Sequence, residues 1–70
     1  MPAFPLRGDH ITLAQAVKAA GLAETGGQAK YLVREGMVLV NGAAERQPTR
    51  KLYLGDRFCV QGGAEWTVSR

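Results

Sequence analysis

The hydrophobic pattern of this chain changes at Gly36, and that change constrains the fold more than any other feature. Before Gly36, apolar residues recur every three or four positions, which is typical of helices. After it, short apolar runs alternate with turn-forming residues, which is typical of strands. The sequence therefore predicts an α+β protein in which two N-terminal helices pack on a small, mostly antiparallel sheet.

Each predicted helix begins with the pattern Thr-x-x-Gln and ends near a glycine. This spacing is that of a capping box, in which a side chain at each end of the motif accepts a backbone N–H. The glycines supply the left-handed residue that commonly follows a helix. The start and end signals are Thr12 with Gln15 and Gly21 for the first helix, and Thr25 with Gln28 and Gly36 for the second.

The second half of the chain predicts strands and turns. Asn41-Gly42 follows the apolar run 37–40 and is the strongest short signal for a two-residue hairpin turn. Residues 47–51 are predicted to form a polar loop, because Pro48 cannot donate to a central strand. Asp56 is expected to cap the turn after Gly55. Further strands are expected at 57–60 and 65–68, the last with Trp66 in the core.

The chain is short enough for one domain with a marginal core. Pro2 and Pro5 disfavour a helix, and Gly8-Asp9 indicates a turn. We therefore expect an extended lead-in at residues 1–11 and a single domain at residues 12–70.

Residues that carry catalytic or metal chemistry are sparse. Cys59 is the single cysteine, expected in a buried strand, and His10 is the single histidine, expected to be exposed. Neither a disulfide nor a zinc-binding spacing is possible with these two residues. We therefore predict no catalytic residues, no metal ligands, no cofactor and no small-molecule substrate. Without an apolar leader or membrane span in the sequence, we expect a cytoplasmic protein with no membrane partner.

The net charge of +3 is concentrated in one part of the chain. Residues 30–57 contain six Lys or Arg and three acidic residues, whereas the rest of the chain contains three of each. Within that segment, Glu45 either orients the adjacent Arg46 or lowers the positive potential around it. A concentrated positive charge favours a polyanionic partner.

Three short motifs occur in an informative order: Gly26-Gly27-Gln28-Ala29-Lys30, the segment 36–42, and Leu54-Gly55-Asp56. Together they resemble the RNA-binding domain of ribosomal protein S-four type, from Ile11 to about Val60. The step Arg50-Lys51-Leu52 makes the chain most similar to the small, free-standing bacterial members. The resemblance implies an alpha-L type RNA-binding motif and structured RNA as partner, for example ribosomal or tRNA-like RNA. The single small core predicts a monomer, and the lack of a nucleophile beside a histidine predicts no catalytic activity.

The resemblance also implies a binding surface made by the outer face of the second helix and the following basic loop. Lys30 and Arg34 are four residues apart and so lie on one side of that helix. Tyr31 either stacks on an unpaired base or packs over a neighbouring stem. Many family members have an arginine early in this helix, where the chain has Gly26 and Gly27. The candidate RNA-binding residues are Gly27, Lys30, Tyr31, Arg34, Arg46, Arg50 and Lys51.

Two other functions fit the same basic surface. One is a protein-interaction module that docks on an acidic partner, and the other is duplex DNA binding. RNA is preferred chiefly through the resemblance, and because the chain has no long recognition helix for the major groove.

Overall fold

The structure is a computed structural model that describes residues 3–70. It contains seven short strands and two helices, with no helix long and apolar enough to cross a membrane within these residues. In chain order the elements are β1 (Ala3–Pro5), β2 (Ile11–Thr12), α1 (Leu13–Ala19), α2 (Gly26–Arg34), β3 (Val38–Val40), β4 (Ala43–Ala44), β5 (Lys51–Leu52), β6 (Arg57–Val60) and β7 (Trp66–Ser69).

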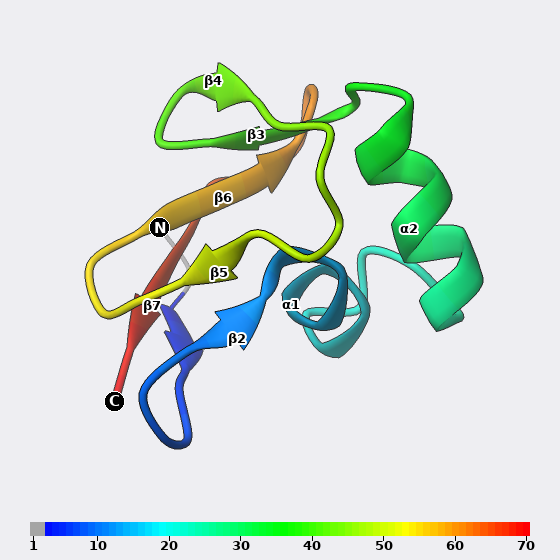
Figure 1. Ribbon diagram of the computed structural model, residues 1–70. Helices are drawn as coiled ribbons and strands as arrows, with labels where there is room; N and C mark the ends of the chain where they lie inside the picture. The colour runs from blue at the N-terminus through cyan, green and yellow to red at the C-terminus, as the bar shows by residue number, and fades with distance from the viewer. Residues whose placement is uncertain (1–2) are drawn as a thin grey trace.

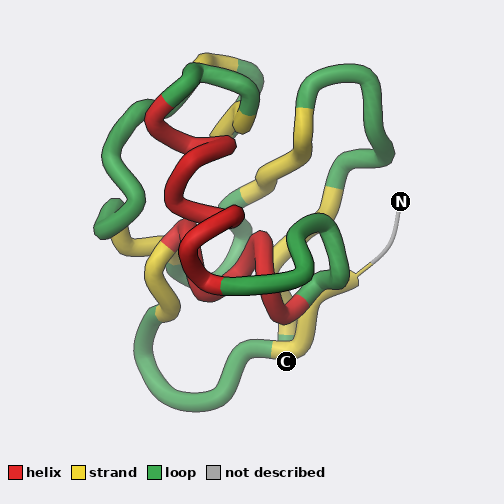
Figure 2. The backbone as a smooth tube through the Cα atoms, turned by 90° about the vertical axis from the view of Figure 1, so that its right-hand side faces the viewer, coloured by secondary structure: helices red, strands yellow, loops and turns green. Residues whose placement is uncertain are grey.

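The strands form two sheets. The larger sheet has the order β1-β7-β6-β3-β4, and the smaller one pairs β2 with β5. Only β1 and β7 are parallel among these pairs; the others are antiparallel. Figure 1 shows both helices at one end of the strands, with the segment between β4 and β5 running past them. Figure 2 views the molecule from that end, with α2 toward the viewer.

The α+β class is confirmed, but the predicted order of elements is not. β1 and β2 precede the helices, so the helices are not N-terminal to the whole sheet. The reason is a pairing between the two ends of the chain, in which Phe4 lies opposite Val68. No local pattern near residue 4 indicates that partner.

Residues 3–11, predicted to form an extended lead-in, contribute to both sheets and to the core. Phe4 and Leu6 are buried, and the Leu6 N–H donates to the Ser69 carbonyl. Residues 1 and 2, where Pro2 was part of the same prediction, lie outside the described residues. We therefore propose that the domain includes β1 and does not begin at residue 12.

The helix ends follow the sequence signals with one difference. Thr12 and Gln15 form the complete capping box at α1. At α2 the Thr25 hydroxyl accepts the Gln28 N–H, but the Gln28 side chain reaches past Thr25 to accept the Glu24 N–H at 2.8 Å. The prediction of a second capping box is therefore wrong in one respect, because the Gln28 side chain accepts the Glu24 N–H and not the Thr25 N–H.

Positive backbone φ angles occur where the sequence predicts turns. Gly21 and Gly36 follow α1 and α2 with φ of 79° and 75°. Asn41 and Gly42 have φ of 52° and 86°, the combination that a tight two-residue hairpin requires. They join β3 to β4 with Val40 opposite Ala43, as predicted.

The core is centred on Phe58, whose side chain is fully buried. Its ring meets Phe4 edge-on at 5.8 Å between centroids and stacks with Trp66 at 6.4 Å. Leu13 and Val33 bring the two helices into the same cluster. Cys59, predicted to be buried, is only half-buried, because alternate residues of a strand face opposite sides and Phe58 takes the inward position.

Replacing Phe4 by alanine tests whether β1 belongs to the domain. Phe4→Ala removes a buried ring from the contact with Phe58, so we expect the free energy of unfolding to fall by about 3 kcal/mol. The measurement is urea denaturation followed by Trp66 fluorescence. The exposed Arg7→Ala should change stability by less than about 0.5 kcal/mol. An equally small effect of Phe4→Ala would show that β1 does not contribute to the stability of the domain.

Candidate nucleic-acid interface

The outer face of α2 carries the predicted helix residues in exposed positions. Ala29 and Val33 are fully buried against the core, which fixes the rotation of the helix. The opposite side therefore faces solvent, and Tyr31 is 59% exposed. The four exposed residues of this face that the sequence singled out are Gly27, Lys30, Tyr31 and Arg34.

A hollow of about 290 Å³ lies where α1, α2 and the loop before β5 meet. Two lysines line it, Lys18 from α1 and Lys30 from α2. No carboxylate is among its lining residues, which are otherwise Thr12, Ala14, Gln15, Gly26, Pro48 and Thr49. Positive charges from two different helices therefore line the same hollow. Sequence reasoning missed Lys18, because only the packing of the helices brings it near Lys30.

The first turn of α2 leaves its backbone open. A Cβ added at Gly26 would meet nothing within 4 Å, and one at Gly27 would meet only the Thr25 hydroxyl, at 3.9 Å. Packing therefore does not require glycine at either position. The first turn of α2 also carries no acidic side chain. No acidic side chain in that turn therefore offsets the positive end of the helix dipole, which favours anions there.

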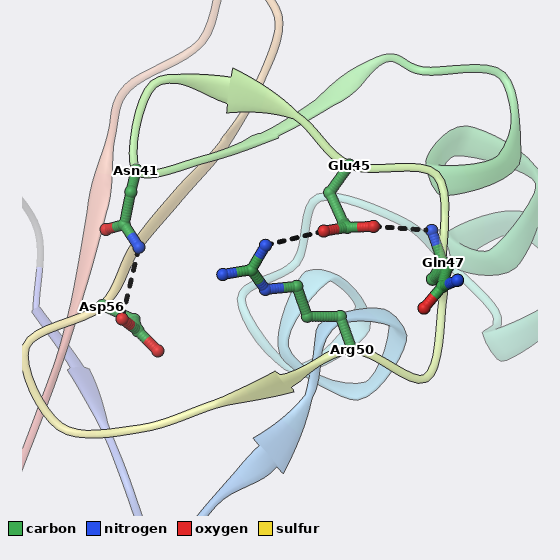
Figure 3. Close-up of polar contacts among 5 residues, drawn as sticks. All are labelled: Asn41, Glu45, Gln47, Arg50 and Asp56. Carbon is green, nitrogen blue, oxygen red and sulfur yellow. Dashed lines mark hydrogen bonds and ion pairs between the residues drawn. The ribbon is translucent and has the colours of Figure 1, made fainter.

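Glu45 organises the loop that follows β4. Its carboxylate pairs with the Arg50 guanidinium at 2.7 Å and accepts the Gln47 N–H at 3.2 Å (Figure 3). The hydrogen bond from Arg50 lowers the pKa of Glu45, against the smaller opposing effect of its partial burial. Of the two roles expected for Glu45, this contact does not orient Arg46, but pairing with an arginine does lower the positive potential of the loop. The partner of Glu45 is Arg50, which it turns back toward the hairpin.

The same loop is attached to α1 through the backbone. The N–H groups of Leu13 and Ala14, in the first turn of α1, donate to the carbonyls of Arg50 and Pro48 at 2.8 and 3.0 Å. These donors have no acceptor within their own helix. The attachment holds the loop beside α1 (Figure 1), and its residues Pro48 and Thr49 line the lysine-lined hollow. Lys51 follows directly, exposed, at the start of β5.

Arg46 folds back onto the C-terminal end of α2. Its Nη1 donates to the Arg34 carbonyl at 3.2 Å, and its guanidinium covers Gly36 so closely that a Cβ there would lie 2.9 Å from Nη2. A cation at this position is favourable because the last carbonyls of a helix carry partial negative charge. Arg46 is therefore part of the predicted surface but has a structural contact of its own.

Asp56 holds two turns together. It accepts the Tyr53 N–H at 2.8 Å and the Asn41 amide at 3.2 Å, the second contact being drawn in Figure 3. Asn41 in turn accepts the Arg57 N–H. The predicted capping role of Asp56 is confirmed, and its carboxylate is committed to the turn.

Comparison with known proteins identifies relatives of similar size. A model of the family described as "S4 domain" matches residues 4–69. "Probable ribosome maturation protein RlbA" of Bacillus subtilis is 40% identical over 60 residues, covering 86% of this chain and 84% of that protein. "Putative RNA-binding protein YbcJ" of Escherichia coli is 36% identical over 60 residues, covering 86% of each.

The contact between Glu45 and Arg50 predicts a measurable titration. We expect the Glu45 carboxyl to titrate below its ordinary pKa in an NMR pH titration, and to return toward that value in Arg50→Ala. A lowered folded pKa means that the pair stabilises the protein above the ordinary pKa and loses this contribution as the pH falls through the lowered one. The contribution should be small, about 0.2–1 kcal/mol, because the pair is partly exposed.

Arg57→Ala is the matched control, since Arg57 pairs with Glu65 at 3.7 Å in another part of the molecule. The described contact would be contradicted if Arg50→Ala left the Glu45 titration unchanged.

Proposed function

The chain belongs to the S4 domain family, and from this we propose that it is a non-catalytic RNA-binding protein with one basic binding surface. That surface consists of the outer face of α2, the lysine-lined hollow and the loop attached to α1. The observation that carries the proposal is the approach of Lys18 and Lys30 to one hollow whose lining contains no carboxylate.

The basic residues contribute unequally. Among residues 3–70, the ion pairs involve Arg50 and Arg57, whereas Lys18, Lys30, Arg34 and Lys51 take part in none. Arg46 is engaged with the end of α2. The strongest phosphate contacts are therefore assigned to the lysines of the hollow and to Arg34, with Arg50 weakened by Glu45. Gly27 has no side chain, so a phosphate can approach its backbone closely.

The proposed recognition is by shape and backbone charge. Lysine offers a compact charge and arginine a planar fork, and both suit phosphate. Structured RNA presents closely spaced phosphates and 2′-hydroxyl groups that short helices and loops can follow. The name of the Bacillus subtilis relative refers to ribosome maturation, which makes ribosomal RNA the first candidate, with tRNA-like RNA as the next.

Catalysis finds no support in the described residues. His10 is exposed and is paired with a tyrosine ring, and Cys59 is half-buried with a pKa raised by that burial. A nucleophile needs a nearby base that a third group orients. We accordingly propose a binding role, in the cytoplasm and as a monomer of one domain.

Docking on an acidic protein and binding to duplex DNA remain the competing functions for the same charges. A competition of structured RNA against duplex DNA separates the second from the proposal directly. Binding to an acidic protein partner with no affinity for any nucleic acid would favour the first.

The salt dependence of RNA binding tests the surface. If about four phosphates are neutralised, the logarithm of the binding constant should fall with log[salt] with a slope of about −3. Lys18→Ala and Lys30→Ala should each weaken binding to a structured ribosomal RNA fragment and reduce the slope by roughly 1. Fluorescence anisotropy at several salt concentrations gives both quantities.

Arg57→Ala removes the same charge from β6 and serves as the control. Equal losses for Arg57→Ala and the two lysine variants would mean that only net charge matters. Binding that is unaffected by salt and by all three changes would refute the proposed function.

A further inference from the structure

Two aromatic side chains form an exposed pair on the small sheet. Tyr53 is 50% exposed, and its ring lies 5.9 Å from that of His10, tilted by 47°. In the β2–β5 pairing, Leu52 lies opposite Ile11 and is fully buried. Because side chains alternate along a strand, Lys51 and Tyr53 face the other way, toward solvent. His10 directly precedes β2 and Tyr53 directly follows β5, so the two rings meet at one end of the small sheet, and Lys51 is exposed on β5 beside them in the chain.

This aromatic face continues the proposed RNA-binding surface. Lys51 and Arg50 belong to the basic loop, and Tyr53 is two residues beyond Lys51 on the same face. Two residues of a strand span about 6.6 Å. Lys51 and Tyr53 are therefore close enough to contact the same polyanion.

A second hollow adjoins the aromatic face on the side of His10. It measures about 480 Å³ and is lined mainly by apolar groups, with Arg7 and His10 among its polar ones. No carboxylate is among the lining residues, which are Phe4, Pro5, Arg7, His10, Ile11, Gln15 and Ala19. His10 therefore contacts Tyr53 and also lines a hollow that is large enough for a nucleobase.

We propose that the outer face of the β2–β5 sheet binds an unpaired segment of the RNA. One base stacks on Tyr53 and His10 with its phosphate at Lys51, and the next nucleotide lies over the hollow beside Arg7. This inference rests on the proposed function, and it adds a binding mode that phosphate contacts alone do not provide. The helix face and Lys18 hold paired RNA, and the small sheet holds the strand that leaves it.

The charges around the pair favour a nucleic acid as the occupant. Lys51 lies two residues before Tyr53 in the chain, and Arg7 lines the same hollow as His10. Of the carboxylates nearby, Asp56 is committed to the Tyr53 N–H and to Asn41, and the exposed Asp9 precedes His10. Aromatic rings near cations suit bases joined by phosphates, since every base has a face that can stack.

The test uses two RNA probes and three variants. One probe is a stem–loop with a fluorescent aminopurine in its loop, and the other is the same stem as a fully paired duplex. Tyr53→Leu removes the ring but keeps an apolar side chain, while Tyr53→Phe keeps the ring. Met37→Ala is the control, because Met37 is an exposed apolar residue outside the proposed binding surface. Urea denaturation verifies that each variant is folded.

We expect Tyr53→Leu to bind the stem–loop about tenfold more weakly, with no change for the duplex, and to lose the quenching of aminopurine that stacking causes. Tyr53→Phe and Met37→Ala should both retain the quenching. The inference is overturned if Tyr53→Leu binds both probes and quenches aminopurine as the unchanged protein does, or if Met37→Ala loses the quenching equally. In either case duplex binding would leave the proposed function standing, whereas failure of the unchanged protein to bind either probe would refute both.

Discussion

The first turn of α1 has backbone N–H groups that its own helix cannot satisfy. Leu13 and Ala14 donate theirs to carbonyls of the loop between β4 and β5, and this links the helices to the sheets. Held there, the loop closes one side of the hollow that Lys18 and Lys30 line. The arrangement of the proposed binding surface therefore depends on hydrogen bonds from the N-terminal end of α1 to the loop.

The polar contacts that give the loop its shape also reduce its charge. Glu45 orders Arg50, and Arg46 is drawn to the end of α2. A chain with such a small core has few other means of fixing a loop, so ion pairs and turn contacts replace buried apolar groups. Consequently the cations of the proposed surface that are free of such contacts, among the described residues, are Lys18, Lys30 and Arg34 of the helices and Lys51 at the end of the loop.

Local features could be predicted from the sequence, and non-local ones could not. The helix ends at Gly21 and Gly36 and the hairpin at Asn41-Gly42 are set by backbone preferences of a few adjacent residues, and the structure has them where predicted. The parallel pairing of β1 with β7 joins opposite ends of the chain, and no local sequence pattern predicts it.

The same distinction applies to the site. The exposure of Lys30, Tyr31 and Arg34 follows from helical periodicity around Ala29 and Val33. The approach of Lys18 to Lys30, and the partners of Glu45 and Arg46, depend on how elements pack, which spacing along the chain does not encode. The family resemblance identified the correct family but not these contacts.

The central claim is that the helices and the attached loop form one RNA-binding surface. An NMR titration of backbone amides with a structured ribosomal RNA fragment tests it most directly. The account predicts that shifts concentrate at Lys18, at Gly27 to Arg34 and in the loop ending at Lys51, while β6 and β7 stay unchanged. Shifts confined to the sheet edge at β4 or to β7, or no shifts at all, would contradict it.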